Sequence, residues 1–223
     1  MSSEHATLVT LLLFIVLILP VWIEMKRAKK SGSDRYIRRI PGVDAIDEAV
    51  GRSAEMGRPT IFSSGLTDIG PTLYACLAVA KYVAKKTAEF KGKIFAPQYA
   101  PENLAITESF IKEGYEEAGR GGSYDPETMI FLSGEQFAYA SGYMGLVQRE
   151  KVASTFLFGE FKAESLLLAE AGQQVNAMQV AASISPEQTP FFISTCDYTL
   201  IGEELYAAAA YLSKDPVQVG TIR

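Results

Sequence analysis

The chain has 223 residues, of which 48% are hydrophobic and 21% charged, a composition typical of a folded protein rather than a disordered one. Its net charge of −5 is unevenly divided, because residues 26–39 hold seven Lys or Arg and one acid, whereas residues from Ile40 onward hold 14 basic and 23 acidic side chains. An acidic domain repels the phosphate backbone, so we expect no nucleic-acid partner.

Histidine and cysteine are scarce. The only histidine, His5, lies near the N-terminus, and the two cysteines, Cys76 and Cys196, are far apart in the sequence. This pattern excludes His-based triads from the rest of the chain and provides no paired thiols for a metal or redox site. We therefore expect no metal and no cofactor, and we interpret both cysteines as buried thiols in a reducing compartment.

An uninterrupted apolar run begins close to the N-terminus. Residues 6–23 carry no charge and are mostly apolar, which is about the length that crosses a ~30 Å hydrocarbon core as a helix. We predict an N-terminal segment, 1–25, whose transmembrane helix contacts the bilayer over about 6–25. A cleaved signal peptide fits less well, because a basic leader and a small-residue cleavage site are missing.

A basic linker, 26–39, follows the apolar run. Positive charge stays on the cytoplasmic side of a membrane, so we expect the N-terminus outside and the remaining domain, 40–223, in the cytoplasm of a single-pass protein. The first basic residues of the linker suit anionic lipid headgroups. They are Lys26, Arg27, Lys29 and Lys30.

The remaining sequence alternates between helical and strand patterns. In chain order we expect a helix at 43–56, a strand at 60–64, a helix at 70–90, a strand at 93–97, a helix at 102–118, a strand at 128–133, a helix at 135–149, a strand at 154–158, a helix at 161–172, strands at 175–182 and 190–195, and a helix at 199–212. Such alternation predicts an α/β fold with a doubly wound, mostly parallel sheet and helices on both faces.

The turn after the first expected strand is rich in glycine and hydroxyl groups. Ligands of open α/β sheets bind beyond the carboxyl ends of the strands, so Ser63, Ser64, Gly65 and Asp68 are candidate ligand-binding residues. The turn could hold a phosphate at a helix N-terminus, but an acid there would repel it. A helix cap formed by Asp68 or Gly70 explains the turn more simply.

Similar polar turns follow three other expected strands. The further candidate residues are Ser133, Glu135, Glu160, Ser194, Thr195 and Asp197. If these turns share one crevice, their carboxylates together with Asp68 could hold Mg²⁺ or perform acid/base work. The alternative is that each acid complements the dipole of a helix first turn.

Some helices are unusually apolar or rich in small residues. Residues 73–83 are apolar nearly all round, and small residues recur at 138–145. Four alanines, Ala207, Ala208, Ala209 and Ala210, stand between Tyr206 and Tyr211 in the last expected helix. Small residues permit close helix approach, either within one subunit or across a contact in a homo-oligomer, and the sequence leaves both alternatives open.

Five stretches together resemble a bacterial membrane-protein family known only as a domain of unknown function, with an N-terminal transmembrane helix before an α/β domain. They are residues 43–59, 63–70, 138–155, 164–175 and 196–212. Members of that family often continue past the position matching Gly220 into further hydrophobic sequence, so this chain either lacks a second membrane segment or is shortened. The resemblance implies the architecture and implies no catalytic residue.

Two functions remain open. The first is a non-enzymatic membrane-anchored module that self-associates or serves as a subunit or scaffold of a membrane complex. Its basis is the apolar run, the small-residue helices, and a domain without histidine or a cofactor motif. The alternative is a small-molecule or nucleotide-binding domain, or an enzyme, that uses a polar crevice at the strand carboxyl ends.

Overall fold

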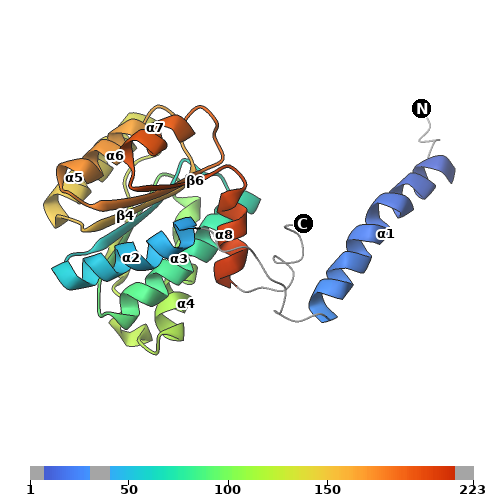
Figure 1. Cartoon of the computed structure of the whole chain (residues 1–223), viewed down its shortest axis with the longest axis horizontal. Coiled ribbons are helices and arrows are strands. Elements are labelled where there is room, and N and C mark those ends of the chain that lie inside the picture. Colours follow the sequence, from blue (N-terminus) through green and yellow to red (C-terminus); the bar gives the residue numbers. More distant parts are fainter. Residues whose placement is uncertain (1–7, 31–40, 214–223) are drawn as a thin grey trace. The chain divides into compact units, whose positions relative to one another are not determined.

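A computed structural model describes residues 8–30 and 41–213. The chain divides into two units, one comprising Met1–Arg38 with Lys214–Arg223 and the other Arg39–Ser213 (Figure 1). Most of the predicted basic linker and both chain ends lie outside the described residues. In the first unit, the described residues form one helix, α1 (Leu8–Lys30). Among the described residues, no helix is long and apolar enough to cross a membrane.

The second unit is an α/β fold. Its elements, in order, are α2 (Pro41–Met56), β1 (Thr60–Gly65), α3 (Pro71–Glu89), β2 (Ile94–Gln98), α4 (Glu102–Glu117), the 3-10 turns η1 (Gly121–Ser123) and η2 (Pro126–Thr128), β3 (Met129–Phe131), α5 (Gln136–Glu150), β4 (Ser154–Glu160), α6 (Ser165–Gln174), β5 (Met178–Ser183), α7 (Thr189–Thr195), β6 (Tyr198–Ile201) and α8 (Glu204–Ser213).

The six strands form one parallel sheet in the order β3-β2-β1-β4-β5-β6. The chain winds outward from β1 to β3, then returns through α5 to β4 on the other side of β1 and winds outward again. The direction of winding therefore reverses between β1 and β4, which is the position where open α/β sheets place their ligand crevice. The predicted α/β class with a parallel sheet is confirmed.

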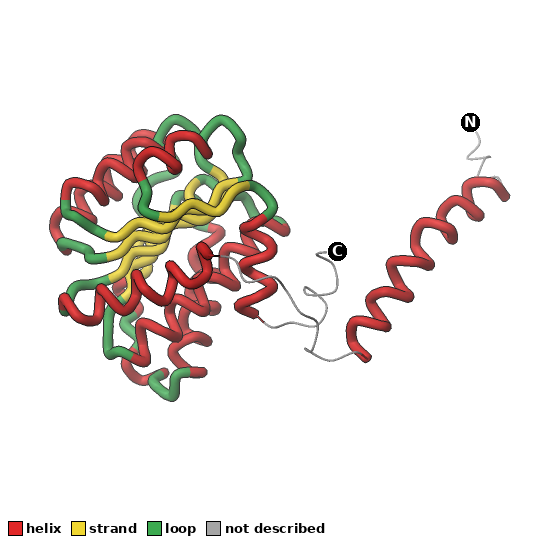
Figure 2. Tube along the Cα trace, in the orientation of Figure 1, coloured by secondary structure: helices red, strands yellow, loops and turns green. Residues whose placement is uncertain are grey.

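Helices cover both faces of the sheet (Figure 2). Successive residues of a strand point to opposite faces, so the adjacent residues Ile61 and Phe62 of β1 belong to two separate cores. The core around Phe62 contains side chains of α2, α3, α4 and α8. The core around Ile61 contains side chains of α5, α6 and α7.

Helix α3 is apolar nearly all round because neighbours surround it. It packs against α4 and α8 within the core around Phe62, and residues from Leu73 to Ala80 are buried except Tyr74. Gly114 of α4 permits this packing, since a Cβ atom there would lie 2.5 Å from the carbonyl oxygen of Lys81. The intramolecular alternative therefore accounts for the apolar segment at 73–83.

Two sequence assignments near the C-terminus are wrong. The predicted strand at 190–195 is helix α7, in which Pro190 occupies the first turn, where a missing N–H costs nothing. The predicted helix at 199–212 begins too early, because Tyr198–Ile201 form the edge strand β6 before α8 starts at Glu204. Short apolar runs such as FFIS do not distinguish a strand from a helix by periodicity.

Candidate functional site

Parallel strands all end at the same edge of a sheet, so the loops after them form one end of the domain, which we call the carboxyl end. Ser63, Ser64 and Gly65 close β1, with Asp68 in the loop that follows, and Glu160 is the last residue of β4. Ser133 and Glu135 lie in the loop after β3, at the edge of the sheet. These candidates share the carboxyl end, as expected from the sequence.

The crevice between β1 and β4 is closed by hydrogen bonds. The backbone N–H of Leu66 donates to the carbonyl oxygen of Glu160 at 2.9 Å, and the N–H of Glu160 donates to Oγ1 of Thr67 at 2.8 Å. Oγ1 of Thr67 in turn donates to the carbonyl oxygen of Ser64. The two strand ends therefore lie against each other where a dinucleotide-binding sheet opens.

Two glycines permit this closure. Gly65 has a φ of 61°, and a Cβ atom there would lie 2.5 Å from the carbonyl oxygen of Glu160. Gly159 has a φ of 153°, and a Cβ atom there would collide with the carbonyl oxygen of Ser64. Both conformations are ones that L side chains rarely adopt, so these glycines serve close backbone approach rather than phosphate binding.

The serines of β1 are committed to the interior. Both Ser63 and Ser64 are buried. Oγ of Ser63 lies 2.7 Å from the hydroxyl oxygen of Tyr139 and accepts a 3.0 Å hydrogen bond from the N–H of Gly65. Burial raises the pKa of the Tyr139 hydroxyl, so this residue stays a neutral hydrogen-bonding partner. The serines stabilise the turn and are not open to a ligand.

A pocket of about 390 Å³ lies beside the closed crevice, where the loops after β1, β4 and β5 meet. Leu66 and Phe161 contribute apolar groups to its wall, and most of the remaining lining is polar or charged. Its lining residues are Leu66, Asp68, Glu160, Phe161, Lys162, Ser185, Glu187 and Gln188. The sequence pointed to Asp68 and Glu160 but gave no signal for the residues from the loop after β5.

The charges of the pocket do not suit an anion. Three carboxylates, from Asp68, Glu160 and Glu187, face one ammonium group, from Lys162. Of the two predicted caps, Gly70 is the one that stands at the N-cap of α3, and no side chain, that of Asp68 included, bonds to the first turn. A phosphate would therefore meet net negative charge at this end of the sheet.

The acids do not converge on a cation either. Within the described parts of the chain, no group of three or more His, Cys, Asp or Glu side chains is arranged to hold a metal ion. Glu135 stands at the N-cap of α5, and no acid lies in the first turn of that helix. Glu160 lies before the first turn of α6, which starts at Ser165.

Ser194, Thr195 and Asp197 lie at the opposite end of the sheet, so the expected single crevice is wrong for them. The cause is the misassigned strand, because these residues precede β6 instead of following a strand. Oδ2 of Asp197 accepts a 2.7 Å hydrogen bond from the N–H of Gln179, near the start of β5. Oγ1 of Thr195 donates to the carbonyl oxygen of Phe191 at 2.6 Å. Both contacts are structural.

The two thiols lie on opposite faces of the sheet, with Cys76 in the core around Phe62 and Cys196 beside the core around Ile61. Burial raises the pKa of Cys196 to about 12, and burial likewise raises the pKa of Cys76. Both thiols therefore stay protonated at neutral pH, as a structural interpretation of these cysteines requires.

One buried acid, Glu164, was not among the residues predicted from the sequence. Glu164 is fully buried at the N-cap of α6, where Oε1 accepts from the N–H of Lys162 at 2.9 Å and Oε2 accepts from Nε2 of Gln136 at 2.6 Å. The adjacent Ser165 donates from Oγ to Oε1 of Gln188 at 2.6 Å. These bonds join the first turns of α5, α6 and α7, which are far apart in the sequence.

The alanines proposed for a subunit contact are used inside the chain. Ala208, Ala209 and Ala210 are buried, and α8 packs against α3. The hydroxyl of Tyr206 lies 2.9 Å from Oγ1 of Thr72 on α3. Tyr206, Ala207 and Tyr211 remain half-buried, so they are the part of the predicted contact that is open to a second copy.

The chain belongs to the family described as "Domain of unknown function (DUF6754)", whose model matches residues 2–223. No curated protein and no solved structure matches the chain. The resemblance to a domain of unknown function is thereby confirmed, whereas a bacterial source and a membrane anchor stay predictions.

Proposed function

We propose that this protein is a membrane-anchored, non-enzymatic α/β module that serves as a subunit or scaffold of a membrane complex. The observation that carries the proposal is the exposure of α1. Every large apolar side chain from Leu11 to Ile23 is at least 37% exposed, and Phe14 is 66% exposed. A helix that is apolar all round needs an apolar environment on every side, which a bilayer provides.

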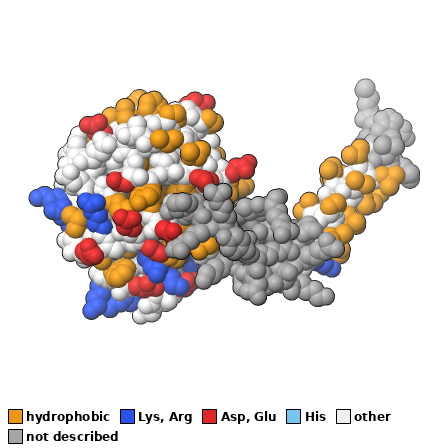
Figure 3. Space-filling view, in the orientation of Figure 1, with side chains coloured by type: hydrophobic (Ala, Val, Ile, Leu, Met, Phe, Trp, Pro, Cys, Tyr) orange, Lys and Arg blue, Asp and Glu red, His pale blue; other side chains and the backbone are white. Residues whose placement is uncertain are grey.

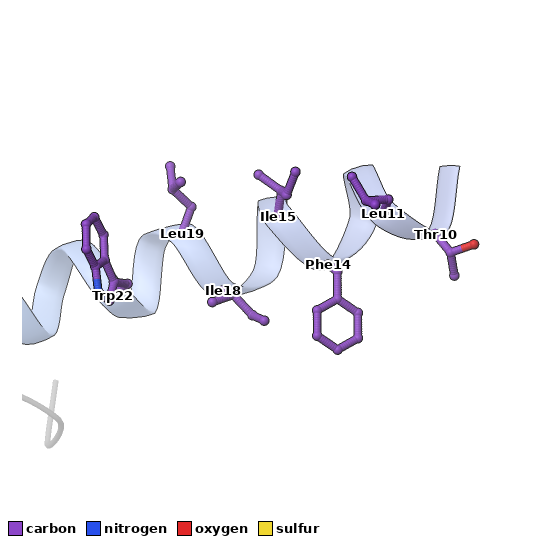
Figure 4. A pocket seen from close by; sticks show the side chains of 7 residues that line it. All are labelled: Thr10, Leu11, Phe14, Ile15, Ile18, Leu19 and Trp22. Atoms are coloured by element: carbon purple, nitrogen blue, oxygen red, sulfur yellow. The ribbon is translucent and has the colours of Figure 1, made fainter. Parts of the chain in front are cut away.

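The apolar side chains of α1 point in several directions (Figure 4). Leu11, Ile15 and Leu19 project to one side of the helix, while Phe14 projects to the other. Burying such a side chain contributes roughly 1.5–3 kcal/mol. Summed over the segment, the free energy of burial exceeds the free energy of unfolding of a typical domain. The proposed span is the whole run 6–23, of which residues 6 and 7 lie outside the described helix.

The end of the apolar run supports the proposed orientation. Nζ of Lys26 lies 3.8 Å from the centre of the Trp22 ring, a cation–π contact between two residue types that favour the membrane interface. The basic residues that follow the apolar run support a cytoplasmic location for the domain, because positive charge favours the cytoplasmic side. This orientation would place Lys26, Arg27, Lys29 and Lys30 near anionic headgroups.

The closed crevice supports a non-enzymatic role. The hydrogen bonds among Leu66, Thr67 and Glu160 draw the ends of β1 and β4 together, at the position where open α/β sheets place their ligand crevice. A second copy could pack on the half-buried face of α8, at Tyr206, Ala207 and Tyr211, and confinement to a bilayer would favour such a contact.

Alkaline extraction of membranes tests the anchor. The full chain should stay in the membrane pellet, whereas Leu13→Arg with Val16→Arg should release it, because each Arg at a helix centre costs about 3 kcal/mol to insert. Leu13→Ala with Val16→Ala is the matched control and should stay in the pellet. Release of the unmodified chain, or retention of the double-Arg variant, would contradict the anchor.

The pocket supports a second candidate, a small-molecule-binding domain. A volume of about 390 Å³ falls within the range of ligand sites, and its three acids favour an amine-bearing or neutral polar molecule. A thermal-shift screen of the full chain in detergent tests this candidate. A ligand at 100 times its dissociation constant adds about 2.7 kcal/mol. That gain should vanish in Glu187→Ala, and a gain that survives this change would place the ligand elsewhere.

A further inference from the structure

Three exposed apolar side chains stand in helical first turns at the carboxyl end of the sheet. Phe137, Leu166 and Phe191 occupy the first turns of α5, α6 and α7, and they are 60%, 42% and 43% exposed. We call these three residues the apolar rim. Single exposed apolar side chains are common on monomeric domains, whereas contiguous sets of them mark interaction surfaces.

The rim is held as one surface. The 2.6 Å bond from Gln136 to Glu164 joins α5 to α6, and the 2.6 Å bond from Ser165 to Gln188 joins α6 to α7. Each bond lies next in sequence to, or within three residues of, a rim residue. Beneath them the rings of Phe161 and Phe192 meet edge to face at 5.1 Å. The three helical turns that carry the rim residues are therefore joined to one another before any partner arrives.

The charge around the rim is negative. The loops that carry or adjoin it hold the carboxylates of Asp68, Glu135, Glu160 and Glu187, and Lys162 is the one basic side chain in the described loops at this end. The opposite end is richer in Lys and Arg, which gather on the side of the domain where α2 ends (Figure 3). The carboxyl end thus repels anionic lipid and attracts a basic partner.

The pocket beside the rim fits a long basic side chain. Leu66 and Phe161 offer apolar contact for an alkyl stem, and the lining holds three carboxylates, from Asp68, Glu160 and Glu187, against the one ammonium group of Lys162. Lys and Arg combine these two properties in one side chain. A surface with an apolar rim and an acidic pocket is therefore complementary to a segment that has apolar residues on one side and Lys or Arg on the other.

We propose that the carboxyl end of the sheet is a docking surface for a Lys/Arg-rich amphipathic segment of another membrane protein. This inference rests on the proposed function and names the surface through which such a module would join a complex. Cytoplasmic segments beside membrane spans carry an excess of Lys and Arg, so proteins in the same membrane would present the complementary charge. The shared bilayer raises the effective concentration of such a partner.

Fluorescence anisotropy of the full chain in neutral lipid nanodiscs tests the proposal. The probe is a labelled amphipathic helical peptide with Leu on one face and Lys and Arg on the other, and its control carries Glu at every basic position. The basic peptide should bind at least about tenfold more tightly than the acidic one. Equal binding of the two peptides would overturn the proposal.

Matched substitutions locate the contact. Phe137→Ser should weaken binding of the basic peptide about tenfold, and Leu166→Ser should act in the same direction. Phe90→Ser is the control, because Phe90 is 53% exposed at the C-cap of α3, at the other end of the sheet. Comparable losses from Phe137→Ser and Phe90→Ser, or no loss from either rim change, would show that the rim is not the site.

Charge reversal tests the acidic component. Glu187→Lys should weaken binding about threefold at low salt, with the difference shrinking as salt screens the charges, whereas Glu127→Lys, in η2, should leave affinity unchanged. A loss of self-association on Phe137→Ser with unchanged peptide affinity would assign the rim to a contact between copies and overturn the proposal. Because alkaline extraction reports the anchor separately, failure of docking is distinguishable from failure of the proposed function.

Discussion

The two ends of the parallel sheet use their polar side chains differently. At the amino end, Oγ of Ser154 lies 2.7 Å from Oγ of Ser53 and 3.0 Å from Oγ1 of Thr60, all of them buried. At the carboxyl end, Asp68 and Glu187 are exposed, and large apolar side chains are exposed beside them. Both ends hold buried hydrogen bonds, such as those of Ser63 and Glu164 at the carboxyl end, but the carboxyl end also keeps exposed acids and apolar side chains available to a partner.

Two aspartates with similar sequence surroundings have different roles at the two ends of the sheet. Asp68 and Asp197 both follow short apolar runs, yet only Asp197 bonds to a strand backbone. An acid of the same type therefore stabilises the fold at one end and leaves its charge for interaction at the other. Substitutions at the amino end of the sheet should therefore lower stability, whereas substitutions at the carboxyl end should weaken binding.

The largest effect is expected at Ala208. Ala208 is buried in the core beneath α8, so Ala208→Glu should cost roughly 4 kcal/mol and unfold much of the domain. Urea unfolding of the full chain in detergent measures this. Ala207→Glu, on the half-buried side of the same helix, is the control and should remain folded. A folded Ala208→Glu variant with reduced assembly would support a subunit contact instead.

A second large effect is expected where β1 and β4 meet. Gly159→Ala places a Cβ atom against the carbonyl oxygen of Ser64, so the free energy of unfolding should fall by roughly 2–4 kcal/mol. Gly51→Ala is the control, because Gly51 lies within α2 with no atom near its Cβ position, and this change should stabilise the domain by about 0.5–1 kcal/mol. Equal stability of the two variants would contradict the closed crevice.

A moderate effect distinguishes the two aspartates. Asp197→Ala removes the acceptor for the N–H of Gln179 and should lower the free energy of unfolding by about 1–2 kcal/mol, with no effect on peptide binding. Asp68→Ala should change stability by less than about 0.5 kcal/mol and should weaken binding. Reversal of this order in thermal unfolding and anisotropy would remove the distinction between the two ends.

The smallest effect concerns a surface ion pair between α3 and α4, away from the carboxyl end of the sheet. Hydrogen bonding to Lys81, and then to Lys85, lowers the pKa of Glu117. Because the pKa of Glu117 is lower in the folded state, its carboxylate stabilises the fold at pH values above the unfolded-state pKa. This stabilisation is lost as the pH falls through the folded-state pKa. Glu117→Gln should therefore cost about 0.5 kcal/mol at pH 7 and less in acid. A cost that grows as the pH falls would contradict this sign.

Much of the fold follows from sequence periodicity, and the candidate site follows only in part. The buried strands at 60–64 and 154–158 are near-continuous apolar runs, and their parallel pairing follows from the helices between them. The edge strand β6 was not predicted, because Tyr198 and Ile201 are exposed and its pattern is that of a short, half-buried segment. Asp197 was expected at the wrong end of the sheet for another reason, because the strand predicted at 190–195 is helix α7.

The pocket and the apolar rim could not be predicted from the sequence, for a different reason. Gln188 and Glu164 belong to loops that come together only when α6 and α7 pack side by side, and no local pattern reports that contact. Glycines at 65 and 159 are visible in the sequence, but their need for close backbone approach depends on the register between β1 and β4. Contacts between loops depend on how the helices and strands pack, so they cannot be predicted from local sequence patterns.

Cysteine labelling in intact cells tests the central claim, a single-pass anchor that holds the domain on the cytoplasmic side. A thiol introduced as Ser3→Cys or Ser31→Cys flanks the apolar run, and labelling is compared with the parent chain, whose Cys76 is buried and whose Cys196 is partly buried. An impermeant maleimide should label position 3 from outside, and it should label position 31 only after the membrane is permeabilised. Labelling of position 31 in intact cells would contradict the account.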